Sequence, residues 1–449
     1  MNAGSKPQIR ADKYKLRQKN TLFVFFVAVI FSAVSAAAQV SQNYQRVPGI
    51  IHVHTKASGG IFSVEEIAKR AKSKGIKIVI LTDSAMRKAQ YSPLPFLRSI
   101  INKTVELNSV LKYGPGKYLK EIETANKSNP DMVIIPGVEV SPFYYWEGNY
   151  FRKNLVMHNW HKNILVIGLD KSSDYKYLPM VSNGKSRFNQ YQGDKGSAPY
   201  QDLIDYVNEK GGLCFWSAPE VKTETTYAGI KLLTLSYYEE LLHTSGYTGF
   251  AAFFEGYRKI GEPAGVWDEV LMEYCKGKRG KPVWTIGEID YHYEGEAGGK
   301  TIDEVQTVFY LPNVAQDFSP AKISRQSILN ALRSGKMYAL WKTKEYGLIL
   351  DKFFIDVDGK PLIMGDEITS SGRVKIYCNI ISSDGKAKSV KVKVIKSGSI
   401  LKIFEGFTPM NVRFQDSNLE KGRKIYYRLD IEGKYPHRIF TNPVFVNIK

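Results

Sequence analysis

The chain has 449 residues, of which 43% are hydrophobic and 24% are charged, so it can bury a sizeable core and is not a disordered chain. Its length predicts two domains. The formal net charge is +19, but Lys and Arg are scattered along the chain instead of gathered on one element, which argues against a nucleic-acid partner and for an anionic surface or a phosphorylated substrate. Cys214, Cys275 and Cys378 are widely spaced, which excludes a disulfide framework and a thiolate zinc site.

Residues 1–38 have the order of a secretory signal: six Lys or Arg with one Asp, then an apolar run, then small residues. Ala36, Ala37 and Ala38 offer a cleavage site before Gln39. The apolar run is short of the ~20 residues that span a bilayer, so an uncleaved anchor is the alternative to a cleaved signal. Removing residues 1–38 leaves a net charge of +14. We expect an exported protein, in the periplasm, outside the cell or at its surface, with no transmembrane segment once the signal is cleaved.

The first predicted strand is GIIHVHT, residues 49–55. Residues two apart in a strand share a face, so His52 and His54 are expected to project together while Ile51 and Val53 pack on the other side. Such a pair can chelate a metal ion. The alternative is a pair of histidines at the edge of the core that are hydrogen-bonded to the backbone.

A strand and helix rhythm continues from there. Ser63 and Glu66 form a capping box before a helix with one apolar stripe, and further helices are expected at 200–212 and 267–280. Seven apolar runs are expected as strands: 49–55, 76–83, 132–140, 163–169, 212–217, 249–256 and 282–290. Continuous apolar strands that alternate with helices predict a parallel α/β barrel, whose function gathers at the carboxyl ends of the strands.

Histidines and acids follow several of these strands. They are His52 and His54 after the first, Asp83 after the second, Glu139 in the third, Glu255 in the sixth, and Asp290 with His292 after the seventh. Imidazole with carboxylate is a ligand set for Zn, Mn or Fe, and Glu139 is placed to bridge two ions. The strand ends therefore predict a metal site.

These residues resemble the PHP (polymerase and histidinol phosphatase) superfamily of metal-dependent phosphoesterases. The matching pieces are HVHT, ILTD, PGVEVS, HKNILVIGL and DYH, in family order across residues 49–343. YYRLDIEG and TNPVFV near the end resemble the β-rich extension of the CehA/McbA-like branch. The resemblance implies a distorted barrel of seven βα units and up to three divalent metal ions that activate water against a phosphoester or related ester.

The chain departs from the family pattern at three expected ligand positions, which hold Gly59, Ser84 and Ser217. Carried over residue by residue, one metal site stays complete, with His52, His54, Glu139 and Asp290. A second keeps Glu139 and His161 without the histidine at Ser217, and a third keeps only His292. The resemblance therefore implies one or two ions rather than three.

Several assignments have alternatives. His161 is preferred over His158 as a ligand because the family histidine precedes an apolar strand. Asp83 is expected to orient a ligand histidine, the alternative being a cap of the next turn. Glu220 and Glu288 are nearby carboxylates that could substitute for lost ligands, and His292 or Glu288 could carry a proton in catalysis. Glu255 is expected to be structural or to position the substrate.

Two more regions complete the chain. Residues 84–130 predict a mostly helical insertion, and the aromatic segment 142–151 that follows Glu139 is expected to pack against it or to stack on a flat ligand such as a sugar. From residue 345 to 449 the runs alternate with Gly, Asp or Ser turns, which predicts an antiparallel β-sandwich-like accessory domain. The barrel domain is expected to occupy residues 39–344.

We expect an exported, metal-dependent hydrolase of the PHP type that acts on a small-molecule or saccharide-linked ester or phosphoester. The alternative is a non-catalytic PHP-like module that binds a glycan or an anionic ligand. This alternative is suggested by the three expected ligand positions that hold no ligand residue. An amidohydrolase-type barrel would need a metal-bridging lysine or acid on a middle strand and two more histidines on the next strands, which residues 212–217 and 249–256 do not supply. The substrate, the metal and the oligomeric state stay open.

Overall fold

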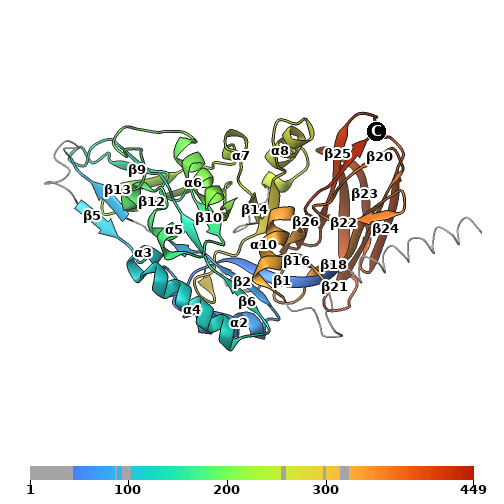
Figure 1. Cartoon of the computed structure of the whole chain (residues 1–449), viewed down its shortest axis with the longest axis horizontal. Coiled ribbons are helices and arrows are strands. Elements are labelled where there is room, and N and C mark those ends of the chain that lie inside the picture. The colour runs from blue at the N-terminus through green and yellow to red at the C-terminus, as the bar shows by residue number, and fades with distance from the viewer. Residues whose placement is uncertain (1–43, 86–87, 94–102, 254–258, 297–299, 314–322) are drawn as a thin grey trace, which may run out of the picture.

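The computed structural model describes residues 44–85, 88–93, 103–253, 259–296, 300–313 and 323–449. The predicted signal at 1–38 and Glu255 lie outside the described residues. The molecule is elongated, with a mixed α/β part at one end and a β-rich part at the other (Figure 1). Within the described ranges, no helix is both long and apolar enough to cross a membrane.

Two sheets build the α/β part. The first contains β1 (Tyr44–Val53), β2 (Ile78–Leu81) and β6 (Val133–Ile135) in parallel, and β16 (Val305–Pro312) and β17 (Met337–Trp341) continue it in antiparallel pairing. The second has the order β15–β14–β11–β10–β7–β3. Its strands are β3 (Asp83–Ser84), β7 (Gly137–Val140), β10 (Ile164–Ile167), β11 (Leu213–Trp216), β14 (Gly249–Phe253) and β15 (Trp284–Gly287). All seven predicted apolar runs thus contain strands.

The predicted all-parallel order is wrong at one strand, because β10 runs antiparallel to both β7 and β11. The connection from β7 to β10 holds β8 (Tyr145–Glu147) and β9 (Val156–His158) in place of a crossover helix. A parallel neighbour needs a crossover of a dozen or more residues, usually a helix, whereas this chain turns back at the end where β7 finishes. The start of β10 therefore lies beside the end of β7, which brings Asn163 close to Glu139.

The two sheets meet where β1 ends. The Ile289 amide donates to the Ile51 carbonyl at 2.9 Å, the Tyr291 amide to the His52 carbonyl at 3.0 Å, and the His54 amide to the Tyr291 carbonyl at 2.9 Å. These bonds tie the segment after β15 to the end of β1. A closed barrel of seven βα units stays a prediction.

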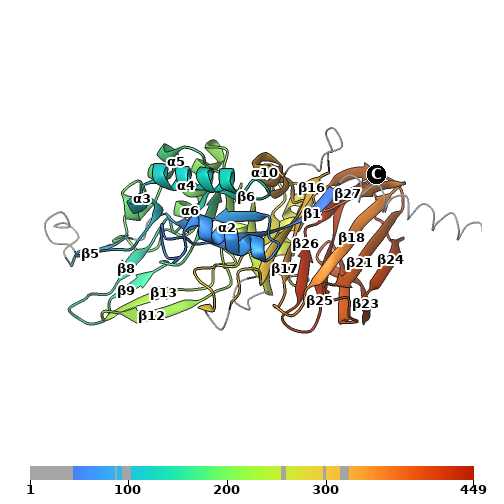
Figure 2. The same ribbon diagram turned by 90° about the horizontal axis from the view of Figure 1, so that it is seen from below.

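Helices cover the outer faces of these sheets (Figure 2). In the first of them, α2, the capping box between Ser63 and Glu66 is present, and the predicted apolar stripe is buried. The helices are α2 (Val64–Ser73), α3 (Val110–Tyr113), α4 (Pro115–Ser128), α5 (Ser172–Lys176), α6 (Ala198–Glu209), α7 (Glu240–His243), α8 (Val266–Cys275) and α10 (Arg325–Ser334). Their burial against the strands forms one large apolar core.

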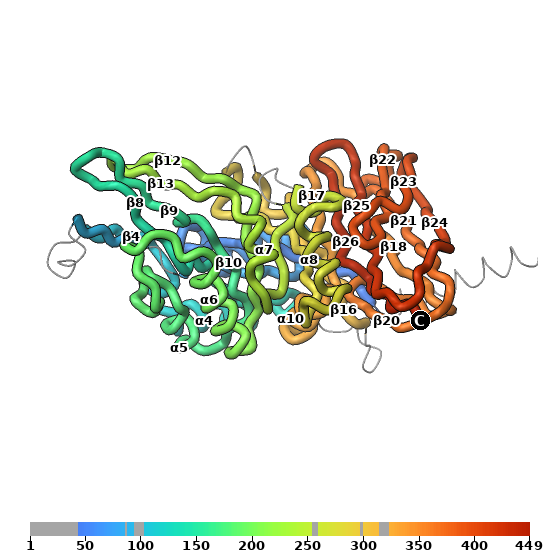
Figure 3. The backbone as a smooth tube through the Cα atoms, turned by 90° about the horizontal axis from the view of Figure 1, so that it is seen from above, coloured from blue at the N-terminus to red at the C-terminus, as the bar shows by residue number. Residues whose placement is uncertain are grey.

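Among the described residues of the predicted insertion at 84–130, the helices α3 and α4 lie in the second half, and β4 (Lys88–Tyr91) and β5 (Lys103–Glu106) pair antiparallel before them. A small sheet of β8 and β9 with β12 (Thr223–Tyr227) and β13 (Ile230–Thr234) extends from the same end (Figure 3). In the aromatic segment, Tyr144 and Trp146 pack edge to face, and Trp146 donates to the carbonyl of Gln90. These two side chains pack against the insertion.

The β-rich part is built from two layers over a second apolar core, and its strands pair antiparallel except for β20, which runs parallel to β27. One layer is β19 (Lys360–Leu362), β18 (Leu348–Val357), β21 (Val374–Ser382) and β24 (Met410–Asp416). The other contains β20 (Glu367–Ser370), β22 (Ser389–Lys396), β23 (Ser399–Phe407), β25 (Lys424–Glu432), β26 (Arg438–Thr441) and β27 (Val444–Ile448). Because β26 pairs with β17, this layer continues the first sheet of the α/β part.

Candidate metal centre

His52 and His54 lie at the end of β1, where the strand departs from regular geometry. The register between β1 and β2 shifts between Ile51 and Val53, and His52 has a φ of 72°. That left-handed conformation is unfavourable for a residue with a side chain, and such strain is concentrated at functional sites. Both rings are buried, with 1% of each residue exposed, and their centroids are 5.1 Å apart.

Asp290 completes a three-residue cluster from the other sheet. Its Oδ1 atom lies 3.3 Å from Nε2 of His52 and 3.3 Å from Nε2 of His54. The ligand atoms of these three residues all lie within 4.8 Å of one another, and among the described residues this is the group of histidine, cysteine and acid side chains that meets that spacing. Asp290 also has a positive φ, 45°, so both strands end in left-handed turns that aim side chains inward.

The hydrogen bonds behind His54 decide its tautomer. Its Nδ1 atom lies 3.1 Å from Oγ of Ser58, and that hydroxyl donates its proton to Asp83 at 2.6 Å. Because a hydroxyl has only one proton, Nδ1 of His54 must be the donor to Ser58, which leaves the lone pair of Nε2 facing Asp290. Asp83 also accepts from the amide of Thr55 at 2.7 Å. Asp83 therefore orients His54 through Ser58.

Glu288 orients His52 by a hydrogen bond to Nδ1, as Ser58 orients His54. Its Oε2 atom lies 3.1 Å from Nδ1 of His52, and its Oε1 accepts from the Ala218 amide at 2.6 Å and from Oγ of Ser217 at 3.2 Å. A carboxylate only accepts, so Nδ1 of His52 donates and Nε2 points toward Asp290. Histidines that bind metals commonly donate their other ring N–H in this way.

The electrostatics of the cluster favour a cation. Burial lowers the pKa of His52, but Asp290, Glu288 and Glu139 outweigh burial and raise it to about 9. Burial likewise opposes ionisation of Asp290, yet the histidines around it hold its pKa well below the usual range. Burial raises the pKa of Glu288. Three carboxylates thus converge on His52, and an added positive charge there is stabilised.

The residues present fit a divalent cation. Nε2 of His52 is buried and has no hydrogen-bond partner among the described residues. It converges with Nε2 of His54 on one carboxylate oxygen, and two imidazoles with a carboxylate suit Zn, Mn or Fe. His52, His54 and Asp290 therefore form a candidate metal site.

His292 lies beside this cluster and fills the space left by Gly59. Its ring stacks on His54 with centroids 4.2 Å apart, and its Nδ1 is 3.9 Å from Oδ1 of Asp290 and 3.3 Å from Oε2 of Glu296. A Cβ at Gly59 would come within 2.9 Å of the His292 ring. Burial and the neighbouring His54 lower the pKa of His292. The imidazole therefore occupies the place that an acid or histidine at Gly59 would need.

Glu139 approaches the same ring nitrogen of His52 as Asp290 does, with Oε1 at 3.6 Å from Nε2 of His52. The same Oε1 atom accepts a hydrogen bond from Nδ2 of Asn163, and Oε2 accepts from Oγ of Ser84 at 3.3 Å. Glu139 is buried, with 6% of the residue exposed. Its carboxylate is thus held by an amide and a hydroxyl of the chain.

The other predicted site residues have different surroundings. The His161 amide bonds Oγ1 of Thr234. His158 pairs with Glu147 at 2.8 Å on the small sheet, and Glu220 accepts from the Ile260 amide at 2.9 Å. Neither His158 nor Glu220 belongs to the cluster. Burial raises the pKa of Glu220 to about 7.

Comparison with models of protein families identifies the family of this chain. The model of the PHP domain matches residues 51–284, which is more than half of the chain. The chain belongs to the PHP-domain family. No curated protein matches it.

Solved structures resemble the PHP domain of this chain at low identity. A two-domain protein from Bacteroides vulgatus, containing a predicted PHP-like metal-dependent phosphoesterase, is 12% identical with a TM-score of 0.36, covering 86% of this chain and 90% of that one. A proposed metal-dependent phosphoesterase from Bifidobacterium adolescentis is 12% identical with a TM-score of 0.30, covering 56% and 90%. An amidohydrolase from Chromobacterium violaceum, with bound sulfate and no metal, is 12% identical with a TM-score of 0.31, covering 66% and 99%.

Two residues of this PHP-domain site were missed from the sequence. Ser58 orients His54, and Asn163 contacts Glu139. Ser58 follows His54 by four residues in a loop, where a serine carries no signal of its own. Asn163 is the first residue of the predicted strand at 163–169, and that position was the available signal.

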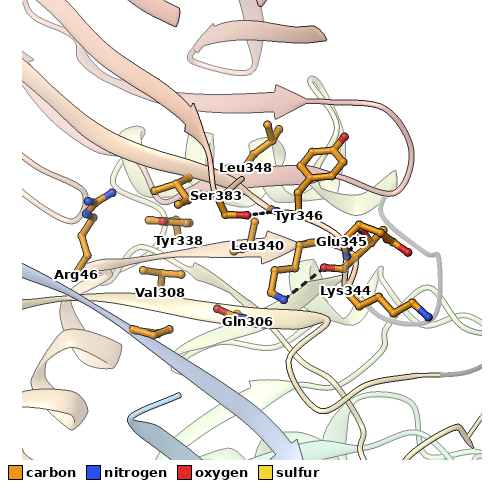
Figure 4. A pocket seen from close by; sticks show the side chains of 15 residues that line it. Arg46, Gln306, Val308, Tyr338, Leu340, Lys344, Glu345, Tyr346, Leu348 and Ser383 are labelled. Atoms are coloured by element: carbon orange, nitrogen blue, oxygen red, sulfur yellow. Dashed lines mark hydrogen bonds between the residues drawn. The ribbon is translucent and has the colours of Figure 1, made fainter. Parts of the chain in front are cut away.

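A separate cleft of about 460 Å³ lies where the PHP domain meets the β-rich part (Figure 4). Two of its charged side chains already have partners: Arg46 bonds the Leu350 carbonyl and pairs with Asp351, and Lys342 pairs with Asp303. None of its lining residues belongs to the candidate metal site. The cleft therefore reflects packing between the two parts of the chain.

Proposed function

We propose that this chain is a metal-dependent hydrolase of the PHP type, a phosphoesterase of the CehA/McbA-like branch. The observation that carries the proposal is the convergence of the Nε2 atoms of His52 and His54 on Oδ1 of Asp290. Their tautomers are set by Glu288 and Ser58, so the ligand atoms are pre-organised for a cation.

A divalent cation at this position supplies Lewis-acid activation of the substrate ester and of water. The side chains of the protein position the atoms that would bind this cation. Glu288 and Ser58 hold the two imidazoles in place, and Asp290 provides the negative charge between them.

Between the two proposed proton carriers, His292 fits the role better than Glu288. The His292 side chain is 25% exposed, so its ring can exchange a proton with solvent, and it stacks on His54 beside the candidate metal site. Glu288 is 0% exposed and accepts hydrogen bonds from His52, Ser217 and Ala218.

The substrate we propose is a small-molecule or saccharide-linked phosphoester or ester, met outside the cytoplasm. The net charge of +14 that remains without residues 1–38 and the predicted signal in those residues support this choice. The rival proposal, a non-catalytic module that binds a glycan or an anion, has one observation in its favour: Glu139 is already held by Asn163 and Ser84.

A screen of generic chromogenic phosphomonoesters, phosphodiesters and carboxylic esters tests the proposal, with the protein loaded in turn with Zn²⁺, Mn²⁺ and Fe²⁺. We expect turnover of at least one ester that is abolished in Asp290→Asn and kept in Asp351→Asn, which alters an acid away from the site. Stoichiometric metal without turnover of any ester would favour the binding module. Absence of bound metal under all loading conditions would contradict the proposed hydrolase.

A further inference from the structure

The carboxylate of Glu139 has each oxygen engaged by a donor of the chain itself. Asn163, at the start of β10, donates from Nδ2 to Oε1, and Ser84, at the end of β3, donates from Oγ to Oε2. Ser84 and Glu139 are also cross-strand partners in the β3–β7 pairing, so the hydroxyl is placed by sheet register. Ser84 and Glu139 thus lie on paired strands, and Asn163 directly precedes β10.

The chemistry of the donors decides what these residues can bind. Because a carboxylate only accepts hydrogen bonds, Asn163 must present its NH₂ group to Glu139. An amide NH₂ has no lone pair to offer a cation, and a serine hydroxyl is a weak ligand for the metals that imidazole binds. A cation on Glu139 would therefore gain no nitrogen ligand from Asn163 or Ser84.

Glu288 is held in a matching way. Ser217 and the Ala218 amide bond Oε1, and Nδ1 of His52 bonds Oε2. The residue is 0% exposed, and these three donors satisfy it without an ion. The hydroxyl at Ser217 therefore anchors a carboxylate instead of facing an open coordination position.

We propose that the site holds a single divalent cation, on His52, His54 and Asp290, because Asn163, Ser84 and Ser217 offer no nitrogen ligand for a second ion. Asn163 and Ser84 fix Glu139, and Ser217 fixes Glu288, so both acids act as anchored acceptors around His52. This inference rests on the proposed function, because it presumes that the first ion binds.

The number of bound ions tests the inference. The full chain is stripped with a chelator, reloaded with excess Mn²⁺, freed of unbound ion and assayed by mass spectrometry of the metal and by electron paramagnetic resonance. We expect one ion per chain and the signal of isolated Mn²⁺. Two ions per chain with an exchange-coupled signal overturn the inference and leave the proposed hydrolase standing. Zero ions overturn both.

Variants separate the two kinds of carboxylate. Glu139→Gln keeps an acceptor for Asn163 and a donor for Ser84, so we expect it to retain one ion, whereas Asp290→Asn loses it. Loss of the ion in Glu139→Gln to the same extent as in Asp290→Asn would show that Glu139 is a ligand and would overturn the inference.

The reverse substitution asks whether these side chains set the ion count. In the double variant Asn163→His with Ser217→His, two imidazoles replace the amide and hydroxyl, and we expect the count to rise from one to two. Circular dichroism and thermal melting confirm that the double variant is folded. A folded double variant that still binds one ion would overturn the role given to Asn163 and Ser217.

Discussion

His52 in the PHP domain and His437 in the β-rich part are both buried, and each has one ring nitrogen with no hydrogen-bond partner among the described residues. Their surroundings have opposite effects. Three carboxylates face His52 and raise its pKa to about 9. His437 stacks on Tyr346 with centroids 3.8 Å apart, and burial lowers its pKa to about 4.

An unbonded ring nitrogen is therefore not enough to indicate a metal site. His437 has one acid, Glu345, that acts on it, and Lys342 and Lys388 offset that acid. His52 has a second imidazole and an aspartate within reach of the same point. The surrounding charge, more than the orphan atom, distinguishes a ligand histidine from a packed one.

The largest expected effect is on Asp290, the residue that sets the PHP-domain cluster apart. Asp290→Asn removes the charge between the two Nε2 atoms, and Asn tolerates the positive φ at this position. We expect metal affinity, measured by isothermal titration calorimetry, to fall by about 1000-fold or more, because losing a ligand exceeds the loss of an outer partner. The melting temperature should change little. Unchanged affinity would mean that the ion binds elsewhere.

His52 and His437 each have a ring nitrogen without a hydrogen-bond partner among the described residues, whereas the side-chain oxygen and nitrogen of Asn442 are both hydrogen-bonded. These bonds of Asn442 join the β-rich part to the PHP domain. Oδ1 of Asn442 accepts from the Thr285 amide at 2.8 Å, and its Nδ2 donates to the carbonyls of Thr285 and Met337 at 3.1 and 3.0 Å. Asn442→Ala strands these buried groups, so we expect the free energy of unfolding to drop by about 3 kcal/mol in urea titration. Asn447→Ala, which cuts exposed bonds to Glu367 and Thr369, is the control and should cost less than about 0.5 kcal/mol. An equal loss in the free energy of unfolding for Asn442→Ala and Asn447→Ala would contradict the stabilising role of the buried Asn442 bonds.

Ser58 tests whether the supporting hydrogen bonds matter. Ser58→Ala removes the acceptor for Nδ1 of His54 and its link to Asp83, so the ring loses its fixed tautomer. We expect metal affinity to fall by about 10-fold, as for other outer partners of ligand histidines. Ser73→Ala, on the exposed end of α2, is the control. If Ser58→Ala binds the metal as tightly as the unchanged protein does, Ser58 does not help to orient His54 for metal binding.

The smallest effect concerns pH and His437. Its folded pKa of about 4 lies below the ordinary value of 6.5, so the unfolded chain takes up a proton first as the pH falls. Stability is therefore lost progressively between about pH 6.5 and pH 4. His437→Gln should lose less over this window in denaturant titrations at several pH values. If the free energy of unfolding falls equally with pH in His437→Gln and in the unchanged protein, the claim that His437 is buried in its neutral form is wrong.

Periodicity predicted the strands well because their apolar runs are buried on both faces. It could not show that β10 runs antiparallel, since direction depends on where the connecting chain turns back, and the small sheet of β8 and β9 has no distinct pattern. The pairing of β4 and β5 was missed for a similar reason: its residues are polar and only partly buried.

The site was partly accessible from the sequence. HxH and the late Asp290 lie at strand ends, and the structure brings them together. The partners of these residues could not be predicted, because Ser58 and Asn163 act through hydrogen bonds that depend on loop course and strand direction. Whether His161 serves as a ligand stays a prediction.

Anomalous X-ray diffraction from crystals loaded with Zn²⁺ tests the central claim most directly. The account predicts one anomalous peak per chain, at about 2.0–2.2 Å from Nε2 of His52, Nε2 of His54 and Oδ1 of Asp290. A peak located elsewhere, or no peak in metal-replete crystals, would contradict the assignment of these three residues as the metal site.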